Sequence, residues 1–274
     1  MVNKTILKWA GSKVRIMDKL LPYLPAGQRL VEPFAGSCSV MMNTQYGAYL
    51  IADANSDLID MYQCIKDNCD GFINFAQDWF SYFNSEHGFY CLRDLFNSDD
   101  VKYKSQIWPA SVFLFLNRHC FNGLCRYNSK GEFNVPFGNW KKPYFPEVEI
   151  LAFAKKSKIT SIHCADWREI LKIVDFGDVV YCDPPYFTKG VNFTQYYKNG
   201  FSHNDHQELT TSLKQLNELL GVPVPVTVSN SIEAKELYAD LGFNIHEIEA
   251  PRTIAANGDC QPAIEIIATL EAGA

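Results

Sequence analysis

The 274-residue sequence has no run of apolar residues close to the ~20 that a membrane-spanning helix needs. Residues 1–25 carry five lysines and arginines and no apolar stretch of the kind found in a secretory signal. The nine cysteines are odd in number, form no C-x-x-C pair and have no histidines at zinc spacing. We therefore expect a cytoplasmic protein with reduced thiols, no membrane association and no metal.

A glycine fingerprint and a net positive charge are also missing. None of the 16 glycines forms the G-x-G-x-x-G of a nicotinamide-binding loop, which leaves an oxidoreductase as a weak alternative. The formal charge of −6 argues against a nucleic-acid partner, but the charges are unevenly distributed. Residues 1–29 hold six basic residues against one acid, and residues 118–146 hold five against one. Because salt screens charge beyond ~8 Å, a local basic surface is compatible with an acidic protein.

Apolar residues make up 47% of the chain and charged residues 20%, enough to form a large core. Stretches of strand type begin near residues 30, 49, 161, 178 and 224, and helical patterns such as 205–220 lie between them. Asn55 or Ser56 is expected to cap the helix after the second strand. The alternation predicts an α/β fold with a mostly parallel, doubly wound sheet.

Residues 57–146 break this alternation. They are rich in helical periodicity and aromatic residues, and become rich in turns from Asn117 onward. The segment 126–135 predicts a hairpin with Ser129-Lys130-Gly131 at its tip. We interpret 57–146 as a mainly helical domain inserted into a catalytic domain made of residues 1–56 and 147–274.

The tetrad Asp183-Pro184-Pro185-Tyr186 directly follows the fourth apolar stretch. Ligands of open α/β sheets bind at such strand ends, and the two prolines remove N–H donors. An acid, backbone carbonyls and an aromatic face remain, which suits a flat group carrying an amine, such as a flipped base. The Asp183 carboxylate and the Pro184 carbonyl would draw on the amine hydrogens while alignment supplies much of the rate. The alternative is a Pro-Pro turn beside an exposed acid.

The stretch EPFAGS (32–37) supports a nucleotide-like ligand, because small residues after a first strand allow close approach to the backbone. Asp53, at the end of the second strand, has the position of an acid that accepts from ribose hydroxyls. Gly36 is equally explained as the residue that closes a strand-to-helix turn.

The sequence resembles the Dam-type DNA adenine methyltransferases, a DPPY-containing family of amino-methyltransferases, from about residue 5 to 270. The matching stretches are LKWAGSK (7–13), VEPFAGS (31–37), ADANSDLI (52–59), LNRHCFNGLCRYNSKGEFNVPFG (116–138), KKPYFP (141–146) and DPPY (183–186). The resemblance implies a Rossmann-like methyltransferase sheet, with 57–146 as the target-recognition domain. It also implies S-adenosyl-L-methionine as donor and adenine in double-stranded GATC as target, reached by base flipping in a bacterial cell or phage-infected host. We expect a monomer.

The resemblance assigns roles to individual residues. Asp183, Pro184, Pro185 and Tyr186 match the catalytic tetrad. The residues that match donor-binding positions are Trp9, Lys13, Phe34, Asp53, Asp166 and Asp183.

A second set matches DNA-binding positions: Lys8, Arg93, Arg118, Phe121, Asn122, Leu124, Arg126, Asn128 and Pro136. Arg126 can form two hydrogen bonds to a guanine edge, while Leu124 and Pro136 can contact a thymine methyl. Lys8 matches a further base contact, and Phe121 and Asn122 match positions beside the flipped adenine. Phosphate or structural contacts are expected for Arg93, Arg118 and Asn128.

The chain departs from the family pattern at Cys38 and Ser12, where glycine is common, and at Asn139 and 257–265, where basic residues are common. Because each lost phosphate contact lowers the salt slope by about one unit, we expect weaker and more salt-tolerant DNA binding than in a basic relative. Alternatives that keep the chemistry are a cytosine amine, RNA or a protein glutamine amide as substrate. A DNA-binding relative with little turnover is a further alternative.

Overall fold

A single seven-stranded sheet runs through the computed structural model, which describes residues 2–98, 105–187, 201–219, 224–251 and 262–271. The strand order is β3-β2-β1-β4-β5-β7-β6. The strands are β1 (Arg29–Glu32), β2 (Ala48–Asp53), β3 (Thr160–Cys164), β4 (Asp178–Cys182), β5 (Val226–Ser231), β6 (Asn244–Ala250) and β7 (Ala263–Leu270). The first five are parallel, and β7 runs antiparallel to both β5 and β6. The predicted α/β class and mostly parallel sheet are confirmed, while β6 and β7 were not predicted.

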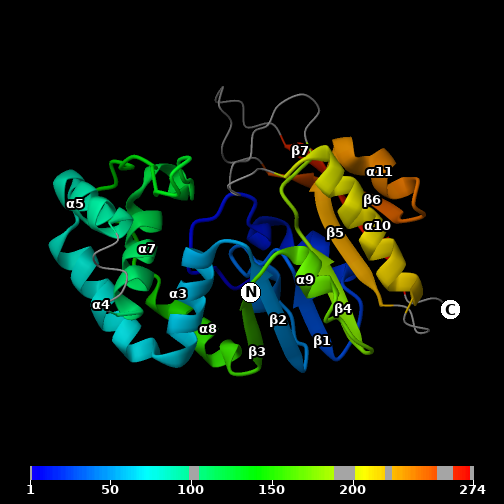
Figure 1. The fold of residues 1–274 in the computed structure, drawn as a ribbon, viewed down its shortest axis with the longest axis horizontal. Helices are drawn as coiled ribbons and strands as arrows, with labels where there is room; N and C mark the ends of the chain where they lie inside the picture. Colours follow the sequence, from blue (N-terminus) through cyan, green and yellow to red (C-terminus); the bar gives the residue numbers. More distant parts are fainter. Residues whose placement is uncertain (1, 99–104, 188–200, 220–223, 252–261, 272–274) are drawn as a thin grey trace.

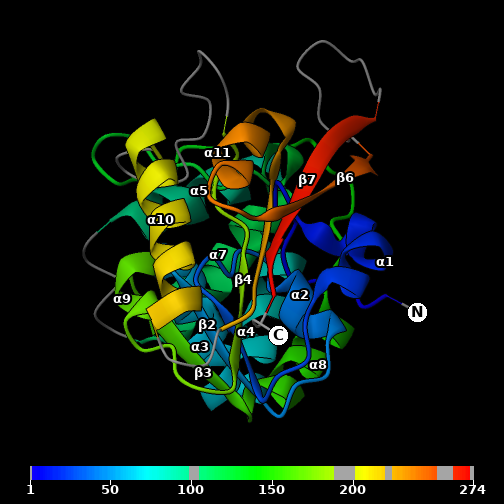
Figure 2. The ribbon, with the colours of Figure 1, turned by 90° about the vertical axis from the view of Figure 1, so that its right-hand side faces the viewer.

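Helices cover both faces of the sheet. Figure 2 shows α1 and α2 on one side of β4 and α9 and α10 on the other. The helices are α1 (Met17–Leu20), α2 (Ser39–Asn43), α3 (Ser56–Asp67), α4 (Cys69–Tyr82), α5 (Glu86–Asn97), α7 (Ile107–His119), α8 (Glu147–Ser157), α9 (Trp167–Leu171), α10 (His203–Leu219) and α11 (Lys235–Ala239). The 3₁₀ turns are η1 (Lys13–Ile16), η2 (Leu21–Tyr23), η3 (Phe121–Gly123) and η4 (Ile232–Ala234).

The sheet divides the protein interior into two hydrophobic clusters, because strand side chains alternate between faces. On β2, Tyr49 and Ile51 pack into one cluster and Leu50 and Ala52 into the other. Every residue of β4 is buried. This is the pattern of a strand covered on both sides, and it explains the continuous apolar run in the sequence.

A helical part lies beside the β3 edge, away from β6 and β7 (Figure 1). It contains α4, α5 and α7, and its core includes the buried rings of Phe72, Phe89, Phe96 and Phe113. Helix α3 contacts both this part and the strands β2 and β3. Its N-terminus is capped by Asn55, whose side chain accepts from the Leu58 amide at 3.1 Å, which confirms the expected cap. The domain limits at 57 and 146 stay a prediction.

The segment 126–135, hereafter the hairpin, reverses direction as predicted but pairs through a single bridge, between Tyr127 and Phe133. Backbone hydrogen bonds join the Asn128 amide to the Glu132 carbonyl and the Asn134 amide to the Arg126 carbonyl, and side chains add to them. The Asn128 side chain accepts from the amides of Lys130 and Glu132 at 2.9 and 3.0 Å. Asn97 of α5 forms two hydrogen bonds with the backbone of Phe133.

The pair Arg29–Asp178 joins the first residues of β1 and β4, which lie opposite each other in register. Nε and Nη2 of Arg29 donate to the two carboxylate oxygens at 2.8 and 2.6 Å, and Asp178 is buried. We expect Asp178→Ala to lower the free energy of unfolding by about 2–3 kcal/mol, since two charge-assisted hydrogen bonds are lost. Urea denaturation measures this change.

The control for this prediction is Glu169→Ala, which removes the exposed ion pair with Lys172. Its expected effect is below about 0.5 kcal/mol. Equal effects of the two substitutions would contradict a stabilising role for the Arg29–Asp178 pair.

Candidate active site

A cavity of about 920 Å³ opens at the carboxyl ends of β1, β2 and β4. Strands β1 and β4 are neighbours at the point where the strand order reverses, the usual binding position in open α/β sheets. The hairpin also lines the cavity, through Tyr127, Asn128, Ser129 and Gly131. The sheet and the inserted segment therefore share one cavity.

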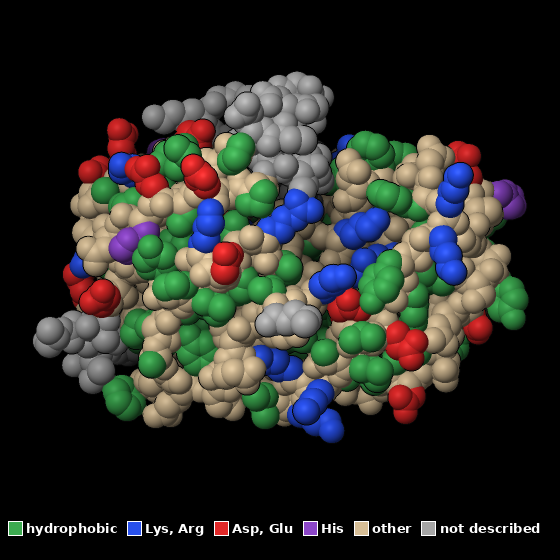
Figure 3. Space-filling view, turned by 180° about the vertical axis from the view of Figure 1, so that it is seen from behind, with side chains coloured by type: hydrophobic (Ala, Val, Ile, Leu, Met, Phe, Trp, Pro, Cys, Tyr) green, Lys and Arg blue, Asp and Glu red, His purple; other side chains and the backbone are tan. Residues whose placement is uncertain are grey.

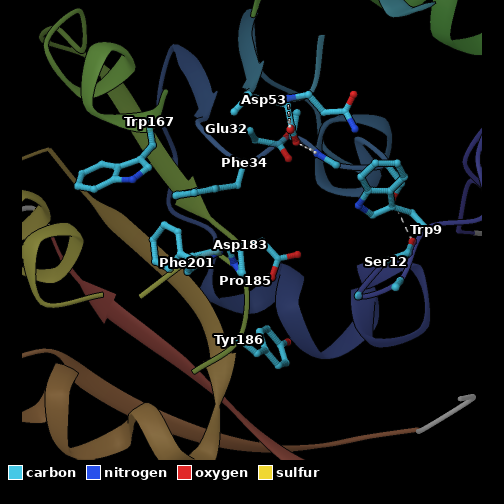
Figure 4. Close-up of a pocket in the computed structure, with 18 of the residues that line it drawn as sticks. Trp9, Ser12, Glu32, Phe34, Asp53, Trp167, Asp183, Pro185, Tyr186 and Phe201 are labelled. Atoms are coloured by element: carbon cyan, nitrogen blue, oxygen red, sulfur yellow. Dashed lines mark hydrogen bonds between the residues drawn. The ribbon is translucent and has the colours of Figure 1, made fainter. Parts of the chain in front are cut away.

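Asp183 lies in this cavity directly after β4 (Figure 4). Its Oδ2 is 2.6 Å from Nζ of Lys13, and the two side chains are 21% and 3% exposed. The Lys13 ammonium also donates to the Gly11 carbonyl at 2.7 Å and lies 4.9 Å from the centre of the Tyr186 ring. Burial raises the pKa of Asp183 to about 6, although Lys13 opposes the shift. The carboxyl is thus ionised at neutral pH and protonated in mild acid.

Three rings form an aromatic wall on another side of the cavity. Phe34 lies 6.5 Å from Trp167 and 5.8 Å from Phe201, measured between ring centres. Figure 4 shows these rings facing the cavity across from Trp9. Such a wall suits a flat heterocycle. Trp167 and Phe201 were not predicted, because nothing in the sequence distinguishes them from core aromatics.

Asp53 ends β2 and is buried, with its two oxygens accepting from the amides of Gly36 and Asn55, each at 3.0 Å. Burial raises its pKa, and these amides oppose the rise. Gly36 itself allows a close contact, since a Cβ there would lie 2.9 Å from Nε1 of Trp9. Asp166 lines the same cavity, caps α9 and pairs with Arg168 at 3.3 Å. The structure thus brings all the predicted donor-binding residues to one cavity.

Glu32 is a cavity residue that was not predicted. It ends β1, is 2% exposed, and its Oε1 has no hydrogen-bond partner among the described residues. Burial raises its pKa to about 8. In the sequence, Glu32 could have been found from its place at the end of a strand, in the stretch EPFAGS (32–37) that also contains Gly36.

Lys8, which precedes the cavity residue Trp9, is held by the inserted segment. Asn117 accepts from the Lys8 amide at 3.0 Å and donates to its carbonyl at 2.8 Å. The Lys8 ammonium lies 3.7 Å from the centre of the Trp140 ring, and burial lowers its pKa. A Cβ at Gly123 would lie 2.2 Å from Cβ of Lys8, so that position requires glycine. Trp140, Asn117 and Gly123 were not predicted.

The remaining base-contact candidates lie just before the hairpin, at its first residue and just after it. Phe121 is 51% exposed, and Asn122 has the left-handed φ of 55° that asparagine tolerates. Leu124 is partly buried, and Pro136 is exposed and accepts from the Phe121 amide at 2.9 Å. Arg126 is exposed, with its Nε donating to the Asn134 side chain at 2.8 Å.

Three DNA-binding candidates have structural contacts. Arg118 is buried and donates to the carbonyls of Thr5 and Ile6, a placement that favours the structural one of its two expected roles. Burial lowers its pKa to about 10. Arg93 lies over the Tyr90 ring, and Asn128 holds the turn of the hairpin.

Two of the positions that depart from the family pattern have a left-handed backbone, which explains why glycine is common at one and why asparagine is accepted at the other. Cys38 has φ 57° and Asn139 has φ 54°, a region that favours glycine and tolerates asparagine. Residues 257–261 lie outside the described part, and the expected salt tolerance stays a prediction. Figure 3 shows lysine and arginine side chains gathered over the middle of the rear face, with acidic ones mostly toward its margins.

Among the described residues, no group of three or more His, Cys, Asp or Glu side chains is arranged to hold a metal ion. In the same part of the chain, no helix has the length and apolar character to cross a membrane.

The sheet order, the cavity at its switch point and the acid after β4 are the features of a Rossmann-like enzyme. The chain belongs to the D12 class N6 adenine-specific DNA methyltransferases, whose family model matches residues 9–254. It is 46% identical to the Retron Ec67 DNA adenine methylase of Escherichia coli, over 96% of this chain and 90% of that protein. It is 44% identical to the DNA adenine methylase of Serratia marcescens, over 93% of each chain. With that of Escherichia coli K12 it shares 37% identity, over 98% of this chain and 95% of the other.

Family membership makes the protein an adenine-specific DNA methyltransferase, as the sequence predicted. Membership of this family also argues against a cytosine amine, RNA or a protein amide as substrate, and against an oxidoreductase activity.

The raised pKa of Glu32 predicts that the free energy of unfolding depends on pH. In the native state it keeps its proton up to about pH 8, whereas its ordinary pKa is 4.5, so unfolding releases a proton between these values. Stability therefore falls as pH rises from 4.5 to 8. We expect Glu32→Gln to flatten this slope and to raise the free energy of unfolding at pH 8 by about 1–3 kcal/mol.

Urea denaturation across this pH range measures the effect. Glu249→Gln, at an exposed carboxyl of β6, is the control and should keep the wild-type slope. An unchanged slope in the Glu32 variant would mean that this carboxyl is ionised in the native state.

Proposed function

We propose that the protein transfers the methyl group of S-adenosyl-L-methionine to the exocyclic amine of an adenine flipped out of duplex GATC. The observation that carries the proposal is the shared cavity, which is lined both by the strand-end carboxylate of Asp183 and by the hairpin that begins at Arg126. A reaction centre and a DNA-reading segment are expected to adjoin when the target base must leave the duplex.

The residues of the cavity fit the donor. The wall of Phe34, Trp167 and Phe201 suits an adenine ring, and Asp53 has the place of an acceptor for ribose hydroxyls. The orphaned Oε1 of Glu32 offers an acceptor for the ammonium group of the methionine part. When bound, S-adenosyl-L-methionine supplies a methyl group made electrophilic by its sulfonium.

The chain's own residues prepare the amine. Asp183 is an ionised acceptor at neutral pH, and the prolines after it leave carbonyls without competing N–H donors. Tyr186 offers an aromatic face beside Asp183. Acceptors that draw on the amine hydrogens localise the nitrogen lone pair, and a fixed alignment lowers the entropic part of the barrier.

Target recognition follows from the exposed groups near the hairpin. The Arg126 guanidinium is exposed and can form two hydrogen bonds to a guanine. Lys8 is held in place for a second base contact. The resemblance to the Dam-type enzymes supports GATC as the sequence. We extend the proposal to a monomer in the cytoplasm, where the described cysteines, all free, would stay reduced.

The decisive experiment for this function incubates the protein with labelled methyl donor and a plasmid. Nucleases that distinguish methylated from unmodified GATC then digest the product. Label on adenine at GATC supports the proposal. Label at another sequence would disprove the target, and no label would disprove the activity.

Replacing Asp183 tests the amine-acceptor role. We expect Asp183→Ala to abolish methyl transfer, and Asp183→Asn, which keeps a neutral oxygen near Lys13, to lower the rate by at least ~10²-fold. In the wild type, the rate should fall as pH drops below about 6, because the carboxyl becomes protonated. Single-turnover rates across pH measure both effects, with thermal denaturation as the check on folding. A folded and active Ala variant would remove the role.

Replacing Arg126 tests the base contact. We expect Arg126→Ala to weaken discrimination at one guanine by about 1–3 kcal/mol. The measurement compares kcat/KM on duplexes with single guanine replacements. Lys130→Ala, at the exposed tip of the hairpin, is the matched control and should leave discrimination unchanged. Discrimination that survives in the Arg126 variant would refute this assignment.

A further inference from the structure

Glu265 introduces a carboxylate into an inner strand of the sheet. It lies on β7 between Ile264 and Ile266, opposite Ser231 of β5 and Ile248 of β6. The side chain is partly buried. A charged group in such a place costs free energy unless it is paired, so its partner indicates what it does.

The partner is Tyr186, the aromatic residue of the tetrad. Its hydroxyl donates to Oε2 of Glu265 at 2.6 Å, a short charge-assisted hydrogen bond. Figure 4 shows the Tyr186 ring at the cavity below Asp183. The hydroxyl is at the far end of the side chain from the backbone, so this bond fixes the ring at its free end.

The backbone next to Tyr186 is held separately, by β5. The Phe187 amide donates to the Asn230 side chain at 3.0 Å, and the Ser231 hydroxyl donates to the Phe187 carbonyl at 2.5 Å. Strand β5 thus fixes the main chain, while β7, through Glu265, fixes the side chain. Without Glu265 the ring would lose the hydrogen bond that holds its free end.

We propose that Glu265 is a positioning residue for methyl transfer, which holds the Tyr186 ring in the plane against which the target adenine stacks. This inference rests on the proposed function of the cavity. It assigns part of the active site to the antiparallel strand β7, far from the tetrad in sequence.

The charge of Glu265 has a second, measurable effect. Its carboxylate raises the pKa of Asp183, in addition to burial, and Lys13 lowers it. The other titratable groups that interact with Asp183 are Glu32 of β1, Tyr181 and Cys182 of β4, and Tyr186. Neutralising Glu265 should therefore shift the acidic limb of the rate profile to lower pH.

Three variants separate positioning from a merely structural role. Glu265→Leu removes the acceptor and should lower the single-turnover rate by roughly 10- to 100-fold, since small misplacements have effects of this size. Tyr186→Phe should lower the single-turnover rate by a similar factor. The double variant should be no slower than either single variant. Glu265→Gln keeps an acceptor and should stay within about threefold of wild type at high pH, with its acidic limb shifted downward. Glu249→Leu, at an exposed position of β6, is the matched control.

The outcomes divide clearly. An inactive wild type would refute the proposed function itself. With an active wild type, a Glu265→Leu or Tyr186→Phe rate close to wild type would overturn the inference. The inference would also be overturned if Glu265→Gln lowered the single-turnover rate as much as Glu265→Leu and left the acidic limb of the rate profile at the wild-type pH. Because Tyr186→Phe removes a single oxygen atom, it keeps the test valid even where Glu265→Leu does not fold.

Discussion

The ion pair between Lys13 and Asp183 is the interaction on which the active site depends. It joins residues 170 positions apart, at 2.6 Å, and Lys13 is almost fully buried. A lone ammonium there would be costly, and the Gly11 carbonyl and the Tyr186 ring complete its surroundings. Burial of the Asp183 carboxyl favours its protonated form, and Lys13 limits that shift so that the acid is ionised at neutral pH. The amine acceptor that we propose must be ionised and partly shielded from water at the same time, and Asp183 in this pair meets both conditions.

The N-terminal segment connects the two functional parts of the molecule through glycines. Trp9 packs against Gly36, in the loop after β1, at a distance that leaves no room for a Cβ. Lys8, the preceding residue, packs against Gly123 in the inserted segment in the same way. Asn117 then fixes the Lys8 backbone with two hydrogen bonds. The loop after β1 and the inserted segment therefore hold two adjacent residues, which sets the spacing between the cavity and the surface that we propose reads DNA.

The sequence predicted those parts of the fold that depend on local patterns. Strands buried on both faces appear as apolar runs, and Asp183 and Asp53 stand where such runs end. Strands β6 and β7 were missed for two reasons. In β6 only the last residue, Ala250, is buried, and the first three residues of β7 are exposed or partly buried. Their antiparallel pairing beside β5 is also a long-range contact that no local pattern encodes. The same reason applies to single residues. Glu265 is an isolated acid in sequence, and Trp167 resembles any core aromatic until the fold places it beside Phe34.

A chain of hydrogen bonds connects the hairpin to the residues that line the cavity. The Tyr127 hydroxyl donates to Asp57 at 2.6 Å and also contacts Asn55, at the start of α3. The Asn55 amide donates in turn to Asp53, which accepts from the Gly36 amide as well. Each step is made by a buried or partly buried group, so water competes with few of these bonds. In the function that we propose, the hairpin must present its side chains at a constant distance from the Asp183 carboxylate. Here that distance is set by bonds that run from the hairpin, through a helix terminus, to the strand ends of the sheet.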